Sequence, residues 1–255
     1  MELTILGSGT GIPLLDRGAP GYLIKIKDEP LLFDSGSGTL LRLLHVGVDY
    51  KRLKYVFYTH THSDHTADLI PLIQALRTTP SFQRVEKLLL HGPVGFAQFL
   101  RTLSQAFGSW LISPDFPLEI QELKQDRLQF ADWRIETIPV KHSQSAIAYR
   151  IEDGESRSIV YAGDTDFCPE IIELAHRADI LILECSFPDD AKVAGHLTPS
   201  LAAEIASRAK CRHLILTHLY PPTEPIEAEI RDRCHRIFSG QISIARDFMK
   251  LTIEP

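Results

Sequence analysis

Four potential metal ligands, His60, His62, Asp64 and His65, stand within six residues, directly after an apolar run at residues 55–58. The apolar run predicts a β-strand, so these side chains lie where that strand ends. On an extended segment His60 and His62 point to the same side, whereas Asp64 and His65 follow where the chain must turn and can face a second point. Imidazole and carboxylate groups bind borderline divalent ions such as Zn²⁺. The run therefore requires a fold that brings other ligands to this strand end, and it indicates two adjacent metals rather than one.

The composition is that of an ordinary globular protein, with 44% of the 255 residues hydrophobic and 24% charged. The net charge of −6 argues against broad non-specific binding to nucleic acid. The four cysteines form no Cys-x-x-Cys pair, which indicates free thiols in a reducing compartment. The N-terminus has no basic segment followed by a long apolar one, and no stretch approaches the roughly 20 apolar residues of a membrane span. We therefore expect a cytoplasmic protein that does not enter a membrane.

Strands and helices are expected in two successive sets. In the first set, strands are predicted at residues 3–6, 22–26, 31–33, 55–58 and 85–90, and helices at 40–46, 67–76 and 94–103. A strand-rich stretch covers residues 118–151. In the second set, strands are predicted at 159–162, 180–183, 214–216, 242–245 and near Leu251, and helices at 171–175, 201–209 and 226–237. No linker separates the sets, so we expect a single domain over residues 1–255, with sheets inside and helices outside.

Three further candidate ligands each follow a predicted strand. They are His142 after residues 135–140, Asp164 after 159–162, and His218 after 214–216. Loops at the carboxyl ends of strands can converge on one site in an α/β fold. The complete set then divides into His60, His62 and His142 for one metal, Asp64, His65 and His218 for the other, and Asp164 as a bridge between both.

The order of these seven residues resembles that of the metallo-β-lactamase superfamily. The resemblance is closer to its ribonuclease Z-like branch, which includes phosphodiesterases. Residues 6–13 (Leu-Gly-Ser-Gly-Thr-Gly-Ile-Pro), with Arg17 beyond them, and residues 32–39 (Leu-Phe-Asp-Ser-Gly-Ser-Gly-Thr) are similar to two motifs of that branch. The resemblance implies an α/β fold, the αββα sandwich, in which two mixed sheets lie face to face with helices on the outer faces. It also implies that Asp34 supports the ligand loop without binding metal.

Two more segments, residues 182–186 (Ile-Leu-Glu-Cys-Ser) and 195–198 (Gly-His-Leu-Thr), resemble those that supply a carboxylate–histidine pair in the same branch. By that resemblance Glu184 orients His196, which protonates the leaving oxygen or contacts the transition-state phosphate. Asp64 would bind metal and accept a proton from the attacking water. The implied cofactors are two divalent metal ions, with Zn²⁺ as the default and Mn²⁺ or Fe as alternatives, and they would lower the pKa of that water.

One departure from ribonuclease Z proper concerns the substrate. That enzyme carries a long tRNA-gripping arm between the segments that hold His142 and Asp164 here, and in this chain those residues are 22 positions apart. The gap has room for a strand and a hairpin turn at residues 153–155 but not for an arm. We therefore expect a dinuclear phosphodiesterase that acts on small phosphodiesters or nucleotide-like esters. A ribonuclease Z-like nuclease without the arm, which processes the 3′ end of tRNA, is the first alternative.

Rival functions stay open at this point. A glyoxalase II-type thioesterase would share the seven ligands but would not need Glu184 and His196. A flavodiiron-like redox protein typically has an acidic residue where this chain has His62. A non-catalytic scaffold would have lost ligands, and none of the seven is missing. Members of the family that the chain resembles commonly form homodimers, so the resemblance implies a homodimer here.

Overall fold

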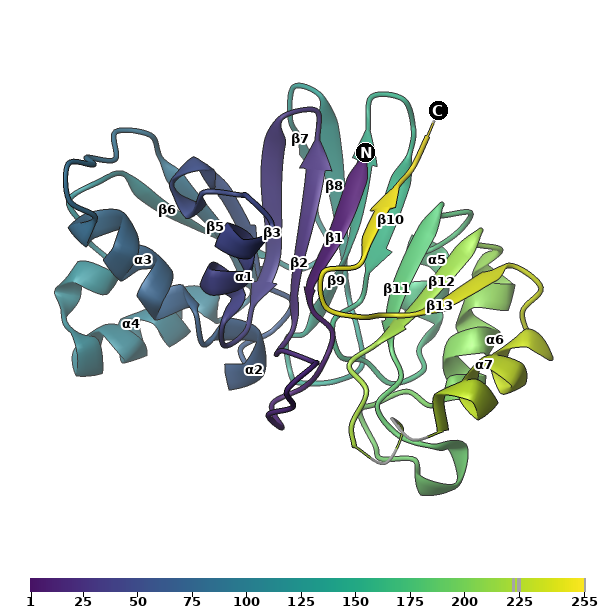
Figure 1. Ribbon diagram of the computed structural model, residues 1–255. Helices are drawn as coiled ribbons and strands as arrows, with labels where there is room; N and C mark the ends of the chain where they lie inside the picture. Colours follow the sequence, from purple (N-terminus) through teal and green to yellow (C-terminus); the bar gives the residue numbers. More distant parts are fainter. Residues whose placement is uncertain (222, 224–225, 255) are drawn as a thin grey trace.

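The computed structural model describes residues 1–221, 223 and 226–254, and its strands form two sheets of seven that make up the middle of the molecule (Figure 1). The first sheet runs, from edge to edge, through β14 (Lys250–Thr252), β1 (Glu2–Gly7), β2 (Gly21–Ile26), β3 (Glu29–Ser35), β4 (Tyr55–Phe57), β5 (Leu88–Pro93) and β6 (Leu118–Leu123). The second runs through β13 (Gln241–Ile244), β12 (His213–Thr217), β11 (Ile180–Glu184), β10 (Ser158–Tyr161), β9 (Ile147–Asp153), β8 (Trp133–Pro139) and β7 (Arg127–Gln129).

Both sheets are mixed, as the family resemblance implies. In the first, β1, β2 and β3 pair antiparallel, and β3 to β6 pair parallel. In the second, β7 to β10 pair antiparallel, and β10 to β13 pair parallel. Parallel strands leave polar loops together at their carboxyl ends, and that edge is where a site can form.

The layers of the fold follow from alternation along single strands. In β3, Leu31 and Phe33 belong to the cluster between the sheets, whereas Leu32 belongs to the cluster between the first sheet and its helices. All three side chains are fully buried, because the sheet is covered on both faces. This is why the strand is apolar at successive positions rather than at every second one. The buried layer between the sheets and the two outer layers confirm the αββα sandwich.

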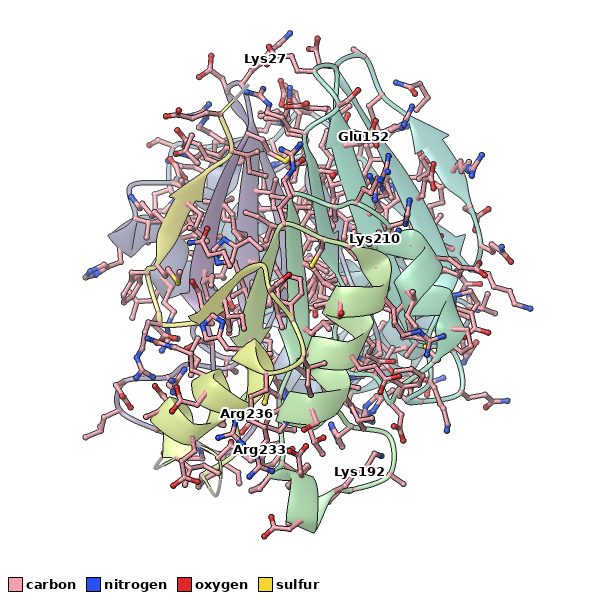
Figure 2. All side chains as sticks on the ribbon, turned by 90° about the vertical axis from the view of Figure 1, so that its right-hand side faces the viewer. Lys27, Glu152, Lys192, Lys210, Arg233 and Arg236 are labelled. Carbon is pink, nitrogen blue, oxygen red and sulfur yellow. The ribbon has the colours of Figure 1, made fainter. Side chains whose placement is uncertain are left out.

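Helices cover the outer face of each sheet (Figure 1). The first sheet carries α1 (Thr39–His45), α3 (Leu69–Thr78) and α4 (Phe96–Phe107), with the short α2 (Ser63–Thr66) at one edge, and the second carries α5 (Pro169–Leu174), α6 (Pro199–Ala209) and α7 (Glu227–His235). Figure 2 shows the α6 side of the molecule, where Lys210 and Arg236 point to solvent. The short 3₁₀ helices are η1 (Tyr50–Arg52), η2 (Ser109–Leu111) and η3 (Asp189–Ala191). No helix in the described part of the chain is long and apolar enough to cross a membrane.

Two predicted helices differ from the observed ones. The helix predicted over residues 67–76 is observed as α3, two residues later at each end, and the short α2 before it was not predicted. The backbone N–H of Asp68 donates to the carbonyl of Ser35 at 2.8 Å, so α2 and α3 do not form one continuous helix. The helix predicted over residues 94–103 begins at Phe96, after Gly95 adopts a positive φ of 96°. It ends four residues later than expected, at Phe107.

The predicted strand at residues 85–90 is also shifted: β5 begins at Leu88 and continues to Pro93. The hydrophobic pattern there is interrupted by charged residues, and pairing with β4 and β6 decides the boundaries. All four cysteines (Cys168, Cys185, Cys211, Cys234) are buried and free, which confirms the expected thiols.

Candidate metal centre

The seven predicted ligands lie together at one edge of the sandwich, although they come from four separate loops. His60 and His62 follow β4, while Asp64 and His65 lie in α2, which stands at the lower edge of the sheets in Figure 1. The other three occupy the loops after β8, β10 and β12, namely His142, Asp164 and His218. The edge predicted from the strand ends is therefore the edge at which these side chains meet.

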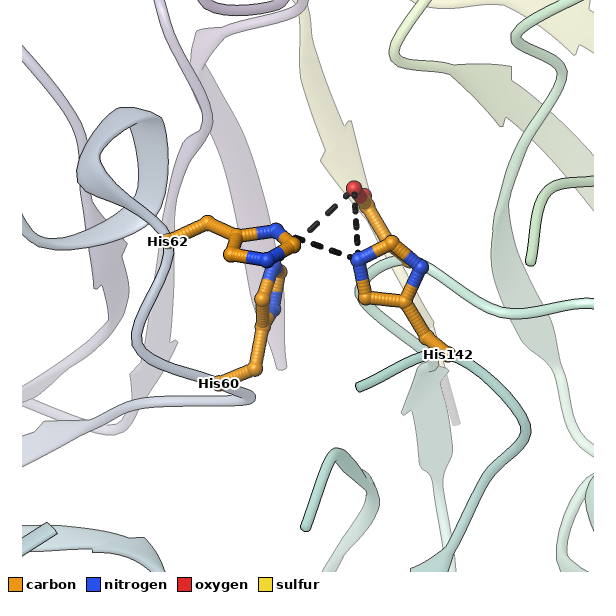
Figure 3. Close-up of side chains that lie close together, drawn as sticks. His60, His62 and His142 are labelled. Atoms are coloured by element: carbon orange, nitrogen blue, oxygen red, sulfur yellow. Dashed lines mark hydrogen bonds and ion pairs between the residues drawn. The ribbon is translucent and has the colours of Figure 1, made fainter. Parts of the chain in front are cut away.

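His60, His62, His142 and Asp164 form a first group whose ligand atoms all lie within 4.8 Å of one another. Nε2 of His142 is 3.1 Å from Nδ1 of His62 and 3.7 Å from Oδ2 of Asp164. Nε2 of His60 is 3.9 Å from the same carboxylate oxygen. Figure 3 shows the three imidazoles converging on one point. Three nitrogens and an oxygen at these separations match the donor set of a zinc site.

Asp64, His65 and His218 form the second group. Nε2 of His218 is 3.3 Å from Oδ2 of Asp64, and Nε2 of His65 is 3.8 Å from that oxygen. The other oxygen of Asp164, Oδ1, lies 3.5 Å from Nε2 of His218 and 3.4 Å from Nε2 of His65. The two oxygens of Asp164 thus face the two groups, which is the arrangement expected of a bridging carboxylate.

Unsatisfied polar atoms at the centre of the cluster fit a metal. Among the described residues, Nε2 of His60, Nε2 of His65 and Oδ1 of Asp164 are buried and make no hydrogen bond of normal geometry. Leaving such atoms without a partner is costly, and buried polar groups in native proteins are nearly always satisfied. Two divalent cations, one at each ligand group, would satisfy these three atoms. The donor set and its surroundings therefore fit the metals that the fold implies.

The electrostatics of the first ligand group favour the protonation states that bind metal. Burial is the main cause that lowers the pKa values of His60, His62 and His142, so these rings are neutral near pH 7. The pKa of Asp164 lies well below its usual range, because His218 and His65 outweigh the opposing effect of burial. Neutral imidazole and ionised carboxylate are the forms that a divalent cation requires. In the second group Asp164 and Asp34 outweigh burial and raise the pKa of His65 well above its usual value, so that ring must release a proton when metal binds.

Asp34 has the place that the resemblance implied, beneath the ligand loop. Its Oδ1 accepts the backbone N–H of Thr59 at 2.9 Å, and its Oδ2 accepts the hydroxyls of Thr59 and Tyr161 at 2.9 and 2.6 Å. Nδ1 of His65 is 2.7 Å from Oδ2. Asp34 adopts a φ of 52°, a left-handed conformation uncommon outside glycine. The carboxylate holds Nδ1 of His65 and thereby leaves Nε2 to face the second ligand group.

Glu184 and His196 are also brought together beside the ligands. Both carboxylate oxygens of Glu184 lie 3.0 Å from Nδ1 of His196, and Glu184 is fully buried. Burial disfavours the charged imidazole, but the hydrogen bond to Glu184 reverses that effect and raises the pKa of His196. The ring of His196 stands 4.9 Å from that of His142 and 6.3 Å from that of His218, so it lies over the edge of both ligand groups.

Some residues that support the site were not singled out from the sequence. The hydroxyl of Ser186 donates to Glu184 and lies 3.1 Å from Nδ1 of His218, so it connects the two. Phe187 and Tyr220 stack with ring centroids 4.8 Å apart beside His196 and His218. The available signal was sequence proximity, because Ser186 follows Glu184 by two positions and Tyr220 follows His218 by two.

A two-layered sheet sandwich with a histidine- and aspartate-rich centre at one edge defines a class of metallohydrolases. The chain belongs to the β-lactamase superfamily domain family, whose model matches residues 31–219. It is therefore a hydrolase of the metallo-β-lactamase fold, and divalent metal ions are implied by that fold.

Relatives within the family include ribonucleases Z. The ribonuclease Z of a Mycobacterium species (strain KMS) is 31% identical over 278 positions, which cover 100% of this chain and 97% of the relative. That of Pyrococcus horikoshii is 28% identical over 305 positions, with 100% and 96% coverage. Among solved structures, the metallo-β-lactamase fold protein YhfI from Bacillus subtilis superimposes with a TM-score of 0.84 at 28% identity, covering 98% of each chain.

Proposed function

We propose that this chain is a dinuclear phosphodiesterase that hydrolyses small phosphodiesters or nucleotide-like esters, with Zn²⁺ as its default metal and Mn²⁺ or Fe as alternatives. The observation that carries the proposal is the Glu184–His196 pair beside a double ligand group. Cleavage of a phosphodiester expels an alkoxide, which needs a proton donor. A thiolate leaves without one, so a thioesterase has no use for this pair.

In the proposed reaction, the metals, Asp64 and His196 each have a separate role. Bound divalent metals supply an acidified water and stabilise negative charge. His218 and His65 outweigh the effect of burial and hold the pKa of Asp64 well below its usual range, so its carboxylate is ionised for metal binding. In the proposed mechanism it would also accept a proton from the attacking water. Nδ1–H of His196 donates to Glu184, so the second proton of the imidazolium form lies on Nε2, from which it would pass to the leaving oxygen. The raised pKa of His196 keeps that proton in place near neutral pH.

The proposed preference for small esters comes from the space between His142 and Asp164. The 21 residues between them contain β9, a tight turn and β10, and the two strands pair with each other. The alignments with the Pyrococcus and Mycobacterium enzymes span 305 and 278 positions against 255 residues here, so both relatives carry segments that this chain lacks. Because the relatives are ribonucleases, an RNA 3′ end is the second candidate substrate. A cytoplasmic location and a homodimer stay predictions.

The test combines metal analysis with substrates that differ in their leaving groups. The metal-loaded protein is assayed with bis-(p-nitrophenyl) phosphate, cyclic nucleotides, a tRNA precursor, a thioester and a lactam. We expect phosphodiester turnover, and we expect Asp64→Ala to lose metal and activity together. His196→Ala should lower kcat about 10²–10⁴-fold on esters with an alkoxide leaving group. It should have a much smaller effect on p-nitrophenyl esters, because p-nitrophenolate leaves without a proton.

The control is His235→Ala, which removes an exposed histidine of α7 and should leave every rate unchanged. Faster turnover of the thioester than of any phosphodiester would refute the proposal and favour the glyoxalase II-type alternative. Cleavage of the tRNA precursor in preference to all small esters would favour the nuclease.

A further inference from the structure

Asp166 lies two residues after the bridging Asp164 and is buried. It is neither one of the seven ligands nor part of the Glu184–His196 pair. Its backbone N–H donates to the carbonyl of Lys141 at 2.6 Å, in an isolated antiparallel bridge. Lys141 directly precedes His142. The loop that carries Asp164 is therefore joined through its backbone to the loop that carries His142.

The side chain of Asp166 reaches a third loop. Oδ2 accepts the backbone N–H of Gly195 at 3.0 Å and the ammonium group of Lys192 at 2.9 Å. Oδ1 accepts the N–H of the following residue, Phe167, at 2.7 Å, which holds the carboxylate in its orientation. Gly195 directly precedes His196. One buried carboxylate thus fastens the loop that presents His196 to the two loops that present metal ligands.

The contact of Gly195 with His142 decides which imidazole nitrogen of His142 is available to bind metal. The carbonyl of Gly195 accepts the Nδ1–H of His142 at 2.8 Å. With Nδ1 occupied as a donor, the free lone pair of His142 is on Nε2, which is the nitrogen that faces His62 and Asp164. The position is tightly defined: Gly195 has a φ of 88°, and a Cβ there would stand 3.4 Å from Nδ1 of His142.

We propose that Asp166 is a positioning residue that acts through Gly195. It holds the Gly195 carbonyl against His142 and so selects the imidazole nitrogen that is offered to the first metal. This inference rests on the metal-binding part of the proposed function and is independent of the substrate. Residues that orient a metal-binding histidine in this way typically change metal affinity about 10–100-fold when they are removed.

The same loop offers a matched control at its other end. Asp189 accepts the backbone N–H and the hydroxyl of Ser200 at 3.1 and 2.7 Å, and the guanidinium of Arg233 at 2.6 Å. It fastens the loop to α6 and α7, on the side of the molecule where Figure 2 labels Arg233 and Lys192. Asp166 and Asp189 are both loop-anchoring carboxylates with a cationic partner, but Asp166 alone of the two contacts Gly195.

The experiment titrates metal-free protein with Zn²⁺ in competition with a chromophoric chelator and needs no substrate. Wild-type protein should bind two ions. Asp166→Ala and Gly195→Ala should each bind one of them about 10–100-fold more weakly and the other unchanged. Asp189→Ala should bind both ions with wild-type affinity, although its unfolding temperature falls.

A second readout reports the tautomer directly. In ¹⁵N NMR of histidine side chains in zinc-loaded protein, His142, assigned with a His142→Asn variant, should carry its proton on Nδ1. That signal should broaden or be lost in Asp166→Ala. Two ions bound with wild-type affinity by both Asp166→Ala and Gly195→Ala would overturn the inference, as would the same weakening in Asp189→Ala. If Asp166→Ala does not fold, Gly195→Ala decides the question. Failure of the wild-type protein to bind two ions would instead remove the dinuclear centre itself, and the inference with it.

Discussion

Asp164 is the residue on which both ligand groups depend. It is buried, and its two oxygens lie 3.4–3.9 Å from nitrogens of the two groups. Sequence reasoning proposed it as a bridge because it follows a strand in the second half of the chain, and the structure places it between the groups. Its role as a shared ligand is open to a direct test.

We predict that Asp164→Ala lowers the affinity for both metal ions by more than about 100-fold, because it removes a ligand from each group. His142→Ala should lower the affinity for one ion only. Metal content after dialysis should approach zero for Asp164→Ala and about one ion per chain for His142→Ala. Equal metal content in the two variants would contradict the bridging role.

Asp34 determines the orientation of His65 without belonging to the ligand set. We predict that Asp34→Ala lowers the free energy of unfolding of metal-free protein by about 3 kcal/mol or more, because four buried donors lose their common acceptor. Metal affinity should fall about 10–100-fold as well. Urea unfolding and zinc titration measure the two effects. Asp28→Ala, at an exposed turn, is the control and should change neither.

At the scale of single elements, most of the individually predicted strands were placed well, including β13 and β14 at the sheet edges, whereas β5 was predicted three residues too early. Strands β3, β4, β11 and β12 consist of buried apolar runs bounded by turn residues, and their positions are correct within one or two residues. The short α2 was not predicted, and α3 begins two residues later than expected, because the backbone N–H of Asp68 bonds to Ser35 in β3, far away in sequence.

His91 in β5 makes the stability of one element depend on pH. Burial lowers the pKa of His91 to about 4 from a usual value of 6.5, and its ring stacks on Phe57 at 4.6 Å. The unfolded chain therefore binds a proton more readily than the folded one between pH 6.5 and 4. Titration of His91 leaves the free energy of unfolding unaffected above pH 6.5 and decreases it as the pH falls from 6.5 to 4. The shift corresponds to about 3 kcal/mol.

We predict that His91→Gln reduces the slope of the unfolding free energy against pH between pH 6.5 and 4 by up to about 1.4 kcal/mol per pH unit. Urea unfolding of metal-free protein at several pH values measures this slope. The matched substitution His235→Gln, at an exposed position, should leave the slope as it is. An unchanged slope in His91→Gln would show that His91 does not titrate in this way.

At the scale of the whole molecule, the metal centre ties loops of both sheets together. Ligands from α2 and the loop after β4 belong to the first sheet, and those from the loops after β8, β10 and β12 belong to the second. Metal bound across this edge stabilises the folded state, because the unfolded chain cannot present the ligands together.

We predict that adding a chelator lowers the unfolding temperature of the zinc-loaded protein. At a free metal concentration 100 times Kd, each site contributes about 2.7 kcal/mol, and about 1 kcal/mol changes the unfolding temperature by about 2–4 °C at this size. Calorimetry with and without EDTA measures the shift. Asp164→Ala should be insensitive to the chelator, and identical unfolding temperatures for wild-type protein in the two conditions would argue against the metal centre.

From the sequence came the identity of the candidate ligands and the class of fold. His60 to His65 stand close together along the chain, and the strand ends that carry His142, Asp164 and His218 can be recognised from local hydrophobic patterns. Such features depend on residues near one another in sequence, which is why they can be read without coordinates.

The tertiary structure decided which atoms meet. Three features depend on segments 29 to 127 residues apart: which oxygen of Asp164 faces a given group, how Asp34 reaches His65, and how Asp166 acts on His142 through Gly195. Local pattern carries no information on those distances, because the packing of the two sheets sets them. The run at His60 to His65 specified the kind of chemistry, and the folding of the sandwich around it determined the geometry in which that chemistry can occur.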